Sequence, residues 1–481
     1  MNEDELLEKA GECGCFQFRI IAMFAVVNIL SAFHYFGPTF LDMQEAGFES
    51  VSQEEGWSGL AAWGQSAFFA GCVLGTLSLG AVADRAGRRL ALLAAWVLAA
   101  AGNALAAAAH APPLFVLGRA VAGLATDTNF FMMYILVMEY MGERWRTAGL
   151  NATVGAFYGV GCAAAPWLAL GCGGWRRLVA ALAGCCALLA PLLFLLLPES
   201  ARWLLQAGRP QRAAACYRSV AAANGRLRHL PHDLVERLQE MSYKITAEAA
   251  ETSASVFGLL KTPVLRRRTL ILIFKSMVLT LCYDATWRDV NDLGFPAQVV
   301  FSASAATILP ACLMILWLQD RVGRKALSAG ALSLCAAAVA LPDVKPGPAA
   351  ALALALLSRL AINVAYNAAT QYAAELLPTQ VRGQGVSAVH VCGYAAGAAS
   401  AHVVGLGPPW RGALLSLLCA AGAALCLLLP ETLHRQLPRT LREAEAFGAD
   451  ETCCLFAWTI RRRQQSPPQP QPQPQDYISH L

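Results

Sequence analysis

The stretch DRAGRR at residues 84–89 decides the fold, because it recurs as DRVGRK at residues 320–325, 236 positions later. Two further pairs of stretches recur in the same order at nearly the same spacing: EYMGERWR (139–146) with ELLPTQVR (375–382), and PES (198–200) with PET (430–432). One short match arises by chance, but three in the same order do not. The chain is therefore predicted to contain an internal duplication, with two similar halves.

The composition predicts a membrane protein. Of the 481 residues, 57% are hydrophobic and 14% are charged, whereas soluble domains carry about 25% charged residues. Because a spanning helix needs about 20 apolar residues, we predict an all-α membrane protein with twelve spans in two pseudo-symmetric six-helix halves, as in many secondary transporters. The predicted spans are 18–38, 58–80, 90–109, 114–137, 149–170, 176–197, 267–287, 298–318, 326–342, 348–371, 385–405 and 411–429.

The placement of lysine and arginine predicts the orientation in the membrane. Basic residues fill the loops after the second, fourth and eighth predicted spans, whereas the loop after the first span has five acidic residues and no lysine or arginine. The basic loops and both termini are therefore expected on the cytoplasmic side. The acidic N-terminus lacks the basic region and cleavage site of a signal peptide, so the first helix is expected to remain as an uncleaved anchor.

The expected organisation has four parts. Residues 1–200 form the N-terminal six-helix half, and residues 265–435 form the C-terminal half. The segment 201–264 is basic and has helical periodicity, which predicts amphipathic helices on the cytoplasmic face of the membrane. The tail 436–481 begins as a charged helix, and its alternating proline and glutamine residues predict an extended, disordered end.

The last four residues, ISHL, place Ser479 two positions before the C-terminal Leu481. A hydroxyl at this distance from a terminal aliphatic residue is the pattern that PDZ domains bind by strand addition. Many C-termini satisfy this pattern by chance. The tail therefore either contacts a PDZ-domain protein or carries the pattern without such a partner.

The repeated loop resembles the signature loop of the major facilitator superfamily, GxxxDRxGRR, which fits residues 80–89 here. The resemblance implies the major facilitator fold, with loop aspartates and arginines that hold the two halves together on the cytoplasmic side when the transporter faces outward. Paired glutamates would complete two charge clusters that form and break as one half rocks on the other; the alternative is a static determinant of topology. The implied cluster residues are Asp84, Arg85, Arg88, Glu139, Arg146, Glu199, Asp320, Arg321, Arg324, Glu375, Arg382 and Glu431.

Three stretches resemble the solute carrier 22 family of organic cation, anion and zwitterion transporters, and most of all its divergent orphan branch. They are PESARWL (198–204), RWRTAGL (144–150) and AELLPTQVRGQGV (374–386). The resemblance implies transport of a small organic ion across the plasma membrane by alternating access. One departure is the loop after the first span, which has about twenty residues without cysteine or a glycosylation sequon. The typical member has a long, cysteine-rich, glycosylated loop there.

A second departure concerns Tyr394, twelve positions after Arg382. At the matching place, cation transporters of the family carry aspartate and anion transporters carry arginine, so the expected charge filter is absent. Ionisable and polar residues inside other spans are functional candidates by default. The predicted cavity residues are Tyr394, Asn363, Tyr366, Asn367, Asp127, Tyr35 and Lys275. Two of these residues have an alternative that stays open. Lys275 either lines the cavity or extends to the membrane interface. Asp127 either lines the cavity or pairs with Arg119.

No cofactor, metal or enzymatic chemistry is expected. The chain has no GxxxxGK[ST] loop for ATP, no recognisable Ser-His-Asp arrangement and no His/Cys cluster with metal-ligand spacing. Two functions remain. The first is a carrier of a small organic solute, which the charged motifs in both halves favour. The second is a transporter-derived receptor or scaffold without net transport, which the altered charge filter and the short external loop favour.

Overall fold

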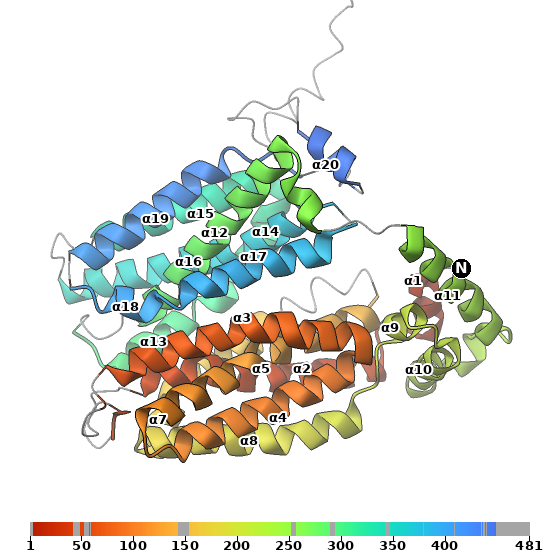
Figure 1. The fold of residues 1–481 in the computed structure, drawn as a ribbon, viewed down its shortest axis with the longest axis horizontal. Helices are drawn as coiled ribbons and strands as arrows, with labels where there is room; N and C mark the ends of the chain where they lie inside the picture. Colours follow the sequence, from red (N-terminus) through yellow and green to blue (C-terminus); the bar gives the residue numbers. More distant parts are fainter. Residues whose placement is uncertain are drawn as a thin grey trace, which may run out of the picture.

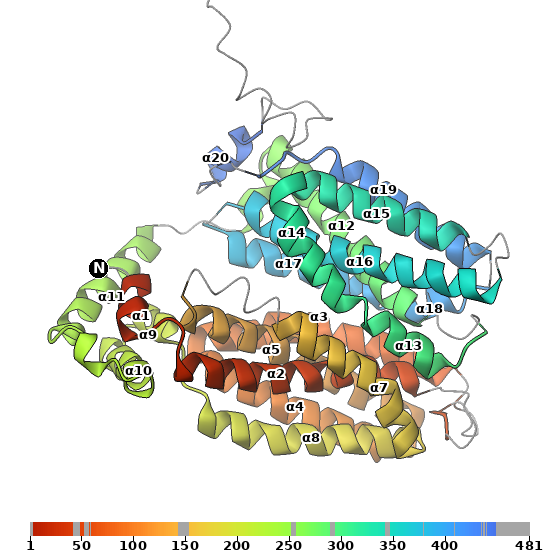
Figure 2. The same ribbon diagram turned by 180° about the vertical axis from the view of Figure 1, so that it is seen from behind.

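The computed structural model shows a chain built from helices (Figures 1 and 2). Among the described residues every named element is helical, apart from an isolated bridge between Glu49 and Gly174. Arg146 and the predicted PDZ contact at Ser479 and Leu481 lie outside these residues. The structure describes residues 3–41, 49–51, 57, 59–142, 153–251, 256–288, 294–341, 347–378, 380–407, 409–433, 435, 438 and 440–448.

The first six spans pack into one bundle, which we call the N-terminal bundle. Its helices are α2 (Cys15–Phe36), α3 (Leu60–Ala86), α4 (Arg88–Ala107), α5 (Pro112–Tyr140), the π-helical turn η3 (Val154–Tyr158) with α7 (Gly159–Cys172), and α8 (Trp175–Leu196). Small residues permit close packing: a Cβ added to Gly71 would lie 2.0 Å from the carbonyl oxygen of Ala120. α3 and α5 therefore approach backbone to backbone.

The remaining spans form the C-terminal bundle. Its helices are α12 (Pro263–Arg288), α13 (Ala297–Ala305), α14 (Ile308–Val322), α15 (Arg324–Ala340), α16 (Pro348–Leu376), α17 (Arg382–Gly397), α18 (Ser400–Val404) and α19 (Trp410–Cys426). The predicted eighth span is divided into α13 and α14, and the eleventh into α17 and α18. In the described part of the chain, nine helical stretches are long and apolar enough to cross a membrane, counting η3 with α7 and α13 with α14 as one stretch each. α15, α17–α18 and α19 supply the three shorter spans, so the twelve-helix prediction is confirmed.

A small helical lobe lies beyond one end of the N-terminal bundle (Figures 1 and 2). It contains α1 (Glu3–Ala10), α9 (Ala201–Gln206), α10 (Pro210–Ala223) and α11 (Leu234–Glu251). Asn224 donates hydrogen bonds to the carbonyl oxygens of Ala10 at 3.3 Å and Gly11 at 3.0 Å, which joins α10 to α1. Apolar side chains of α1, α10 and α11 are buried together: Leu6, Leu7, Val220, Leu234 and Leu238. These apolar faces therefore pack against one another. The predicted contact of segment 201–264 with the membrane face stays a prediction.

The two bundles meet along two pairs of helical segments. α3 lies against α17, and α7 with η3 lies against α13 and α14. A Cβ added to Gly397 would lie 2.9 Å from the ring of Phe69, and one added to Gly155 would lie 3.2 Å from Cys312. Glycine therefore allows close approach at both contacts between the bundles.

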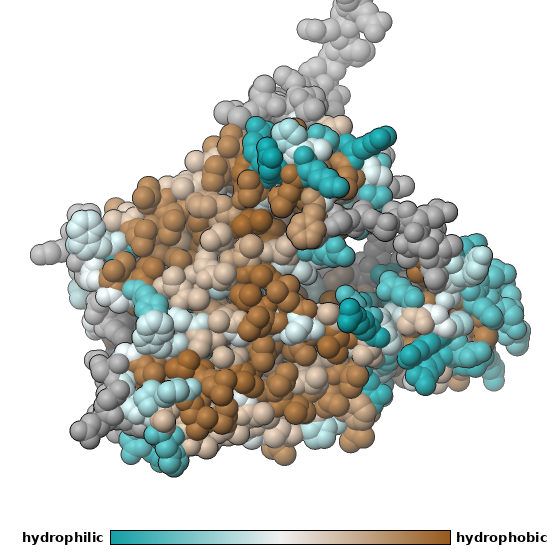
Figure 3. All heavy atoms as spheres, viewed as in Figure 1, coloured by the Kyte–Doolittle hydropathy of each residue, from teal (hydrophilic) through white to brown (hydrophobic). Residues whose placement is uncertain are grey.

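The outer surface of the bundles is strongly apolar (Figure 3). Leu188 and Leu195 on α8 are each 76% exposed, and Leu417 on α19 is 68% exposed. Apolar area on this scale is unfavourable in water and favourable against lipid tails. These surfaces are the ones expected to face the bilayer.

Candidate functional site

The first DRxGRR loop forms a charge cluster at the end of the N-terminal bundle that faces the lobe; we call this side of the molecule the basic end. Glu199 accepts hydrogen bonds from the backbone N–H groups of Arg88 at 2.9 Å and Arg89 at 3.2 Å, the first two residues of α4. Gly87, with φ of 106°, makes the turn that precedes them. Arg88 donates to Asp84 at 3.2 Å. Glu199 thus places negative charge at a helix N-terminus, where it is favourable.

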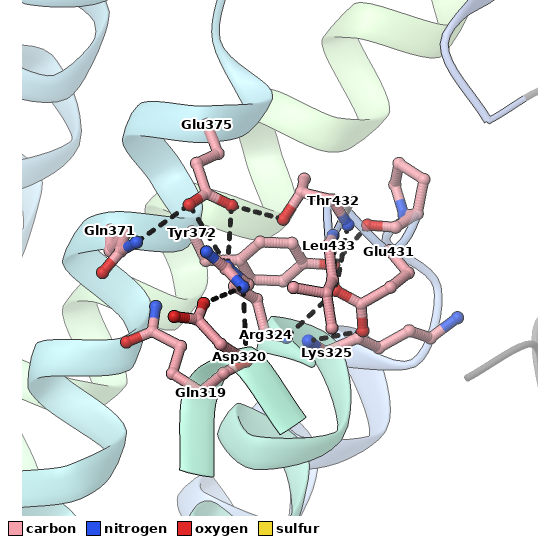
Figure 4. Close-up of polar contacts among 11 residues, drawn as sticks. Gln319, Asp320, Arg324, Lys325, Gln371, Tyr372, Glu375, Glu431, Thr432 and Leu433 are labelled. Atoms are coloured by element: carbon pink, nitrogen blue, oxygen red, sulfur yellow. Dashed lines mark hydrogen bonds and ion pairs between the residues drawn. The ribbon is translucent and has the colours of Figure 1, made fainter. Parts of the chain in front are cut away.

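The second copy of the loop repeats these contacts in the C-terminal bundle (Figure 4). Glu431 accepts from the backbone N–H groups of Arg324 at 3.0 Å and Lys325 at 3.2 Å. Arg324 also donates to Asp320 at 3.0 Å and to both carboxylate oxygens of Glu375, at 3.2 and 3.1 Å. The structure therefore brings together four of the predicted cluster residues around one loop.

A pair of tyrosines that sequence reasoning missed supports both clusters. The hydroxyl of Tyr140 donates to the carbonyl oxygen of Glu199 at 2.5 Å, and that of Tyr372 donates to the carbonyl oxygen of Pro430 at 2.6 Å. The two tyrosines are 232 positions apart, the same offset as the PES and PET stretches. Comparing the halves at that offset would have found them.

In the described part of the chain, the ion pairs of each cluster join residues of the same bundle. The side chains of Asp84 and Asp320 are 78% and 73% exposed, and each pairs with the arginine four residues later. Arg85 and Arg321 are also exposed at the basic end. None of the ion pairs among the described residues joins the two bundles. The contact between the halves that the resemblance implies belongs to the outward-facing state, so it stays a prediction.

Two further predicted cluster residues lie near these loops. Glu139 is in the last turn of α5, directly before Tyr140. Arg382 begins α17 and donates to the carbonyl oxygen of Leu377 at 3.2 Å. Both residues therefore belong to the basic end of their own bundle.

A cavity of about 610 Å³ lies between the bundles, a volume suited to a small organic molecule. Six of the seven predicted cavity residues line it: Tyr35, Asp127, Asn363, Tyr366, Asn367 and Tyr394. Lys275 does not; its ammonium group lies 3.7 Å from the sulfur of Cys426 and 4.7 Å from the ring centre of Tyr372, beside a separate void of about 20 Å³. That prediction is wrong because hydropathy does not tell which face of a helix points to the cavity.

Asp127, on α5, is held from two sides. Its carboxylate accepts hydrogen bonds from the hydroxyl of Tyr394 on α17 and from that of Thr76 on α3, the latter at 2.9 Å. The alternative pairing with Arg119 is not formed; Arg119 donates instead to Asn103 at 3.1 Å. Because eight residues of helix extend about 12 Å, Arg119 and Asp127 lie at different depths in the bundle.

The cavity opens toward the basic end. Asp320 lines the cavity and is also exposed at that end. At the opposite end, contacts between the bundles close it: the rings of Phe36 and Phe301 pack at 5.3 Å, and Trp167 donates to Ser302 at 3.0 Å. The cavity is therefore open at the basic end and closed at the opposite end.

Comparisons with known proteins agree with this architecture. Residues 15–401 match the family model of the Major Facilitator Superfamily. The chain is 31% identical over 404 residues to an organic cation transporter protein of Drosophila melanogaster, covering 81% of this chain and 72% of that protein. It is 30% identical over 404 residues to solute carrier family 22 member 2 of Homo sapiens, covering 79% and 68%. The chain belongs to the solute carrier 22 family of the major facilitator superfamily.

Solved structures share the fold of this solute carrier 22 member at low sequence identity. The proton:xylose symporter XylE bound to 6-bromo-6-deoxy-D-glucose superposes with a TM-score of 0.65 and 16% identity, covering 90% of this chain and 98% of XylE. The inward open conformation of XylE from E. coli gives the same TM-score and identity over 89% and 99%. The chain is therefore a multi-pass membrane transporter by family and fold, and not an enzyme.

In this solute carrier 22 protein, one wall of the cavity is aromatic, which the sequence did not predict. Five aromatic side chains line the cavity together with Asp127: Phe130, Phe131, Tyr134, Tyr158 and Tyr283. Three of them lie three, four and seven positions after Asp127 on α5, the spacing of one helix face. That spacing was visible in the sequence. Tyr158 lies in the π-helical turn η3, a feature common near functional sites that hydropathy does not reveal.

Proposed function

We propose that this protein carries a small organic ion, specifically an organic cation, across the plasma membrane by alternating access. The Drosophila melanogaster relative, which is named as an organic cation transporter protein, supports this class of solute. The cavity supports it by its size and its position between two bundles. The two charge clusters at the basic end are proposed to act in closing that end when the bundles rock.

Asp127 is the observation that carries the proposal. Its carboxylate lines the cavity beside the rings of Phe130, Phe131 and Tyr134, while the described lining residues include no lysine or arginine. A carboxylate in a site shielded from water attracts a cation strongly, and aromatic faces add to this attraction. Tyr394 occupies the place where cation transporters are implied to carry aspartate. We propose that α5 supplies the missing carboxylate from across the cavity.

We also propose the orientation. The basic end, which carries the arginine-rich loops and lies beside the lobe, is cytoplasmic by the positive-inside rule. The cavity then faces the cytoplasm in the structure described. Both termini are proposed to be cytoplasmic as well, and the C-terminal Ser479 and Leu481 to be available there to a PDZ-domain protein.

Uptake by purified protein in liposomes tests the proposal. With an inside-negative potential, wild-type protein is expected to accumulate labelled phenethylammonium, and Asp127→Asn is expected to reduce the rate at least about tenfold, because it removes the charge but keeps the shape. Asp233→Asn is the matched control. Asp233 lies outside the spans and accepts from Arg237 at 2.7 Å, which lowers the pKa of its carboxyl and keeps it charged. Loss of this charge is expected to leave uptake unchanged.

The results separate the candidate functions. Equal uptake by wild type and Asp127→Asn would contradict the assigned role of the carboxylate. Accumulation of benzoate in place of phenethylammonium would contradict the class of solute. Saturable binding of phenethylammonium without any uptake would contradict the carrier and favour a receptor.

A further inference from the structure

The two hydrogen bonds to Asp127 come from different halves of the molecule. Thr76 is on α3 in the N-terminal bundle, together with Asp127 itself on α5, whereas Tyr394 is on α17 in the C-terminal bundle. Both carboxylate oxygens are engaged: Oδ2 by Thr76 and Oδ1 by Tyr394. The Tyr394 hydrogen bond therefore crosses the cavity and joins the two bundles.

The ring of Tyr394 also packs on the N-terminal bundle. Its centre lies 6.3 Å from that of Phe69, and it shares one buried apolar cluster with Phe69, Cys72 and Ala122. Gly397, in the next turn of α17, has no side chain to push Phe69 away. The phenol is only 7% exposed, so its hydroxyl is held against the carboxylate by packing as well as by the hydrogen bond.

We propose that the Tyr394 hydroxyl is an internal competitor for the Asp127 carboxylate and thereby determines the specificity of the cavity. This inference rests on the proposed function, in which Asp127 binds a cation. A protonated amine carries N–H donors, so it replaces the phenol at Oδ1 with an equivalent, charge-assisted hydrogen bond. A quaternary ammonium ion has no donor and cannot make this replacement. The site therefore selects protonated amines over quaternary ammonium ions.

The same exchange ties binding to movement. When the amine takes Oδ1, the hydrogen bond between α5 and α17 is lost, and the two bundles are held together at this level by fewer contacts. A ligand shifts a conformational equilibrium only through contacts that differ between the states. The hydrogen bond from Tyr394 to Asp127 is such a contact, because it can form only while the two bundles are close at this level. A bound amine replaces this bond.

Binding measurements on the full chain in lipid nanodiscs test this inference with phenethylammonium as the probe. Tyr394→Phe keeps the ring and removes the competitor, so the dissociation constant is expected to fall about tenfold, the factor that one hydrogen bond to a charged group supplies. Tyr243→Phe is the matched control, because it also removes a tyrosine hydroxyl, but from a side chain on α11 that is 78% exposed and does not line the cavity. It is expected to leave the dissociation constant within about twofold of wild type. A gain of affinity cannot arise from structural damage.

The second probe is the N,N,N-trimethyl derivative of the same amine. Wild-type protein is expected to bind it at least about tenfold more weakly than phenethylammonium, because it offers no donor to replace the phenol. Equal affinity for the two ions would overturn the selectivity. Unchanged or weaker phenethylammonium binding in Tyr394→Phe, at an unchanged melting temperature, would overturn the competition. If that variant does not fold, Tyr394→Leu, which also lacks the hydroxyl, gives the same test.

Asp127→Asn separates this inference from the function on which it rests. Loss of binding in Asp127→Asn together with no gain in Tyr394→Phe would overturn the competition and leave the cation site intact. Unchanged binding in Asp127→Asn would overturn both. Loss in the first variant and gain in the second is the result expected here.

Discussion

Glu199 and Glu431 make the same contacts in the two halves, although the sequence suggested a different role for them. Glu431 is fully buried and accepts backbone hydrogen bonds from Arg324, Lys325, Thr432 and Leu433 at 2.9 to 3.2 Å. The first N–H groups of a helix have no partner within it, so a buried carboxylate stabilises them. The family resemblance implied that these glutamates belong to the loop clusters. It did not predict backbone partners, because N–H directions depend on the turn geometry.

Glu431→Ala and Glu431→Gln separate acceptor geometry from charge. Alanine leaves the buried N–H groups without this acceptor and is expected to lower the free energy of unfolding by about 3 kcal/mol. Glutamine keeps one carbonyl oxygen and is expected to cost about 1 kcal/mol. Thermal melting in detergent measures both. Equal drops in melting temperature would show that the charge matters and the backbone contacts do not.

At the scale of elements, hydropathy predicted the number and order of the spans and missed the breaks within them. The break between α13 and α14 follows side-chain chemistry: Thr307 donates to the carbonyl oxygen of Ser304 at 2.7 Å and accepts from Asn363 at 3.2 Å. Such bonds compete with the helix ladder. The break between α17 and α18 involves the other bundle, because Ser66 on α3 donates to the carbonyl oxygen of Ala398 at 2.7 Å. A partner 332 positions away is invisible to any local pattern.

Ser66→Ala tests that element contact. Removing the hydroxyl deletes the bonds to Ala398 and to the ring of His402, at 2.7 and 3.1 Å. Because each hydrogen bond contributes about 1 kcal/mol, the α17–α18 segment is expected to open at least about fivefold more often. Hydrogen exchange of the peptide 398–407 measures this. Ser78→Ala is the control, since Ser78 bonds within α3 to Leu74 at 2.7 Å. Identical exchange in both variants would mean that the contact does not hold the break.

At the scale of the whole molecule, the cavity arises because the ion pairs of each charge cluster form within one half and the two bundles touch along only part of their length. The sequence predicted six cavity residues correctly as lining, since polar groups inside apolar spans seek a shielded partner or water. It did not predict which end of the cavity is open. That property belongs to the relative position of two bundles, which depends on contacts such as Phe36 with Phe301 and Trp167 with Ser302.

Neutralising both exposed loop aspartates tests the link between the clusters and the movement of the bundles. In the state described, Asp84 and Asp320 make exposed ion pairs with the arginine four residues later, and such pairs contribute at most about 1 kcal/mol. The double substitution Asp84→Asn with Asp320→Asn is therefore expected to leave the melting temperature nearly unchanged. If these aspartates join the bundles when the basic end closes, uptake of phenethylammonium falls at least about tenfold, because the closed state loses its contacts while the open state keeps its own. Asp233→Asn again serves as the control. Full uptake in the double variant would mean that the loops set topology alone and that other contacts close the basic end.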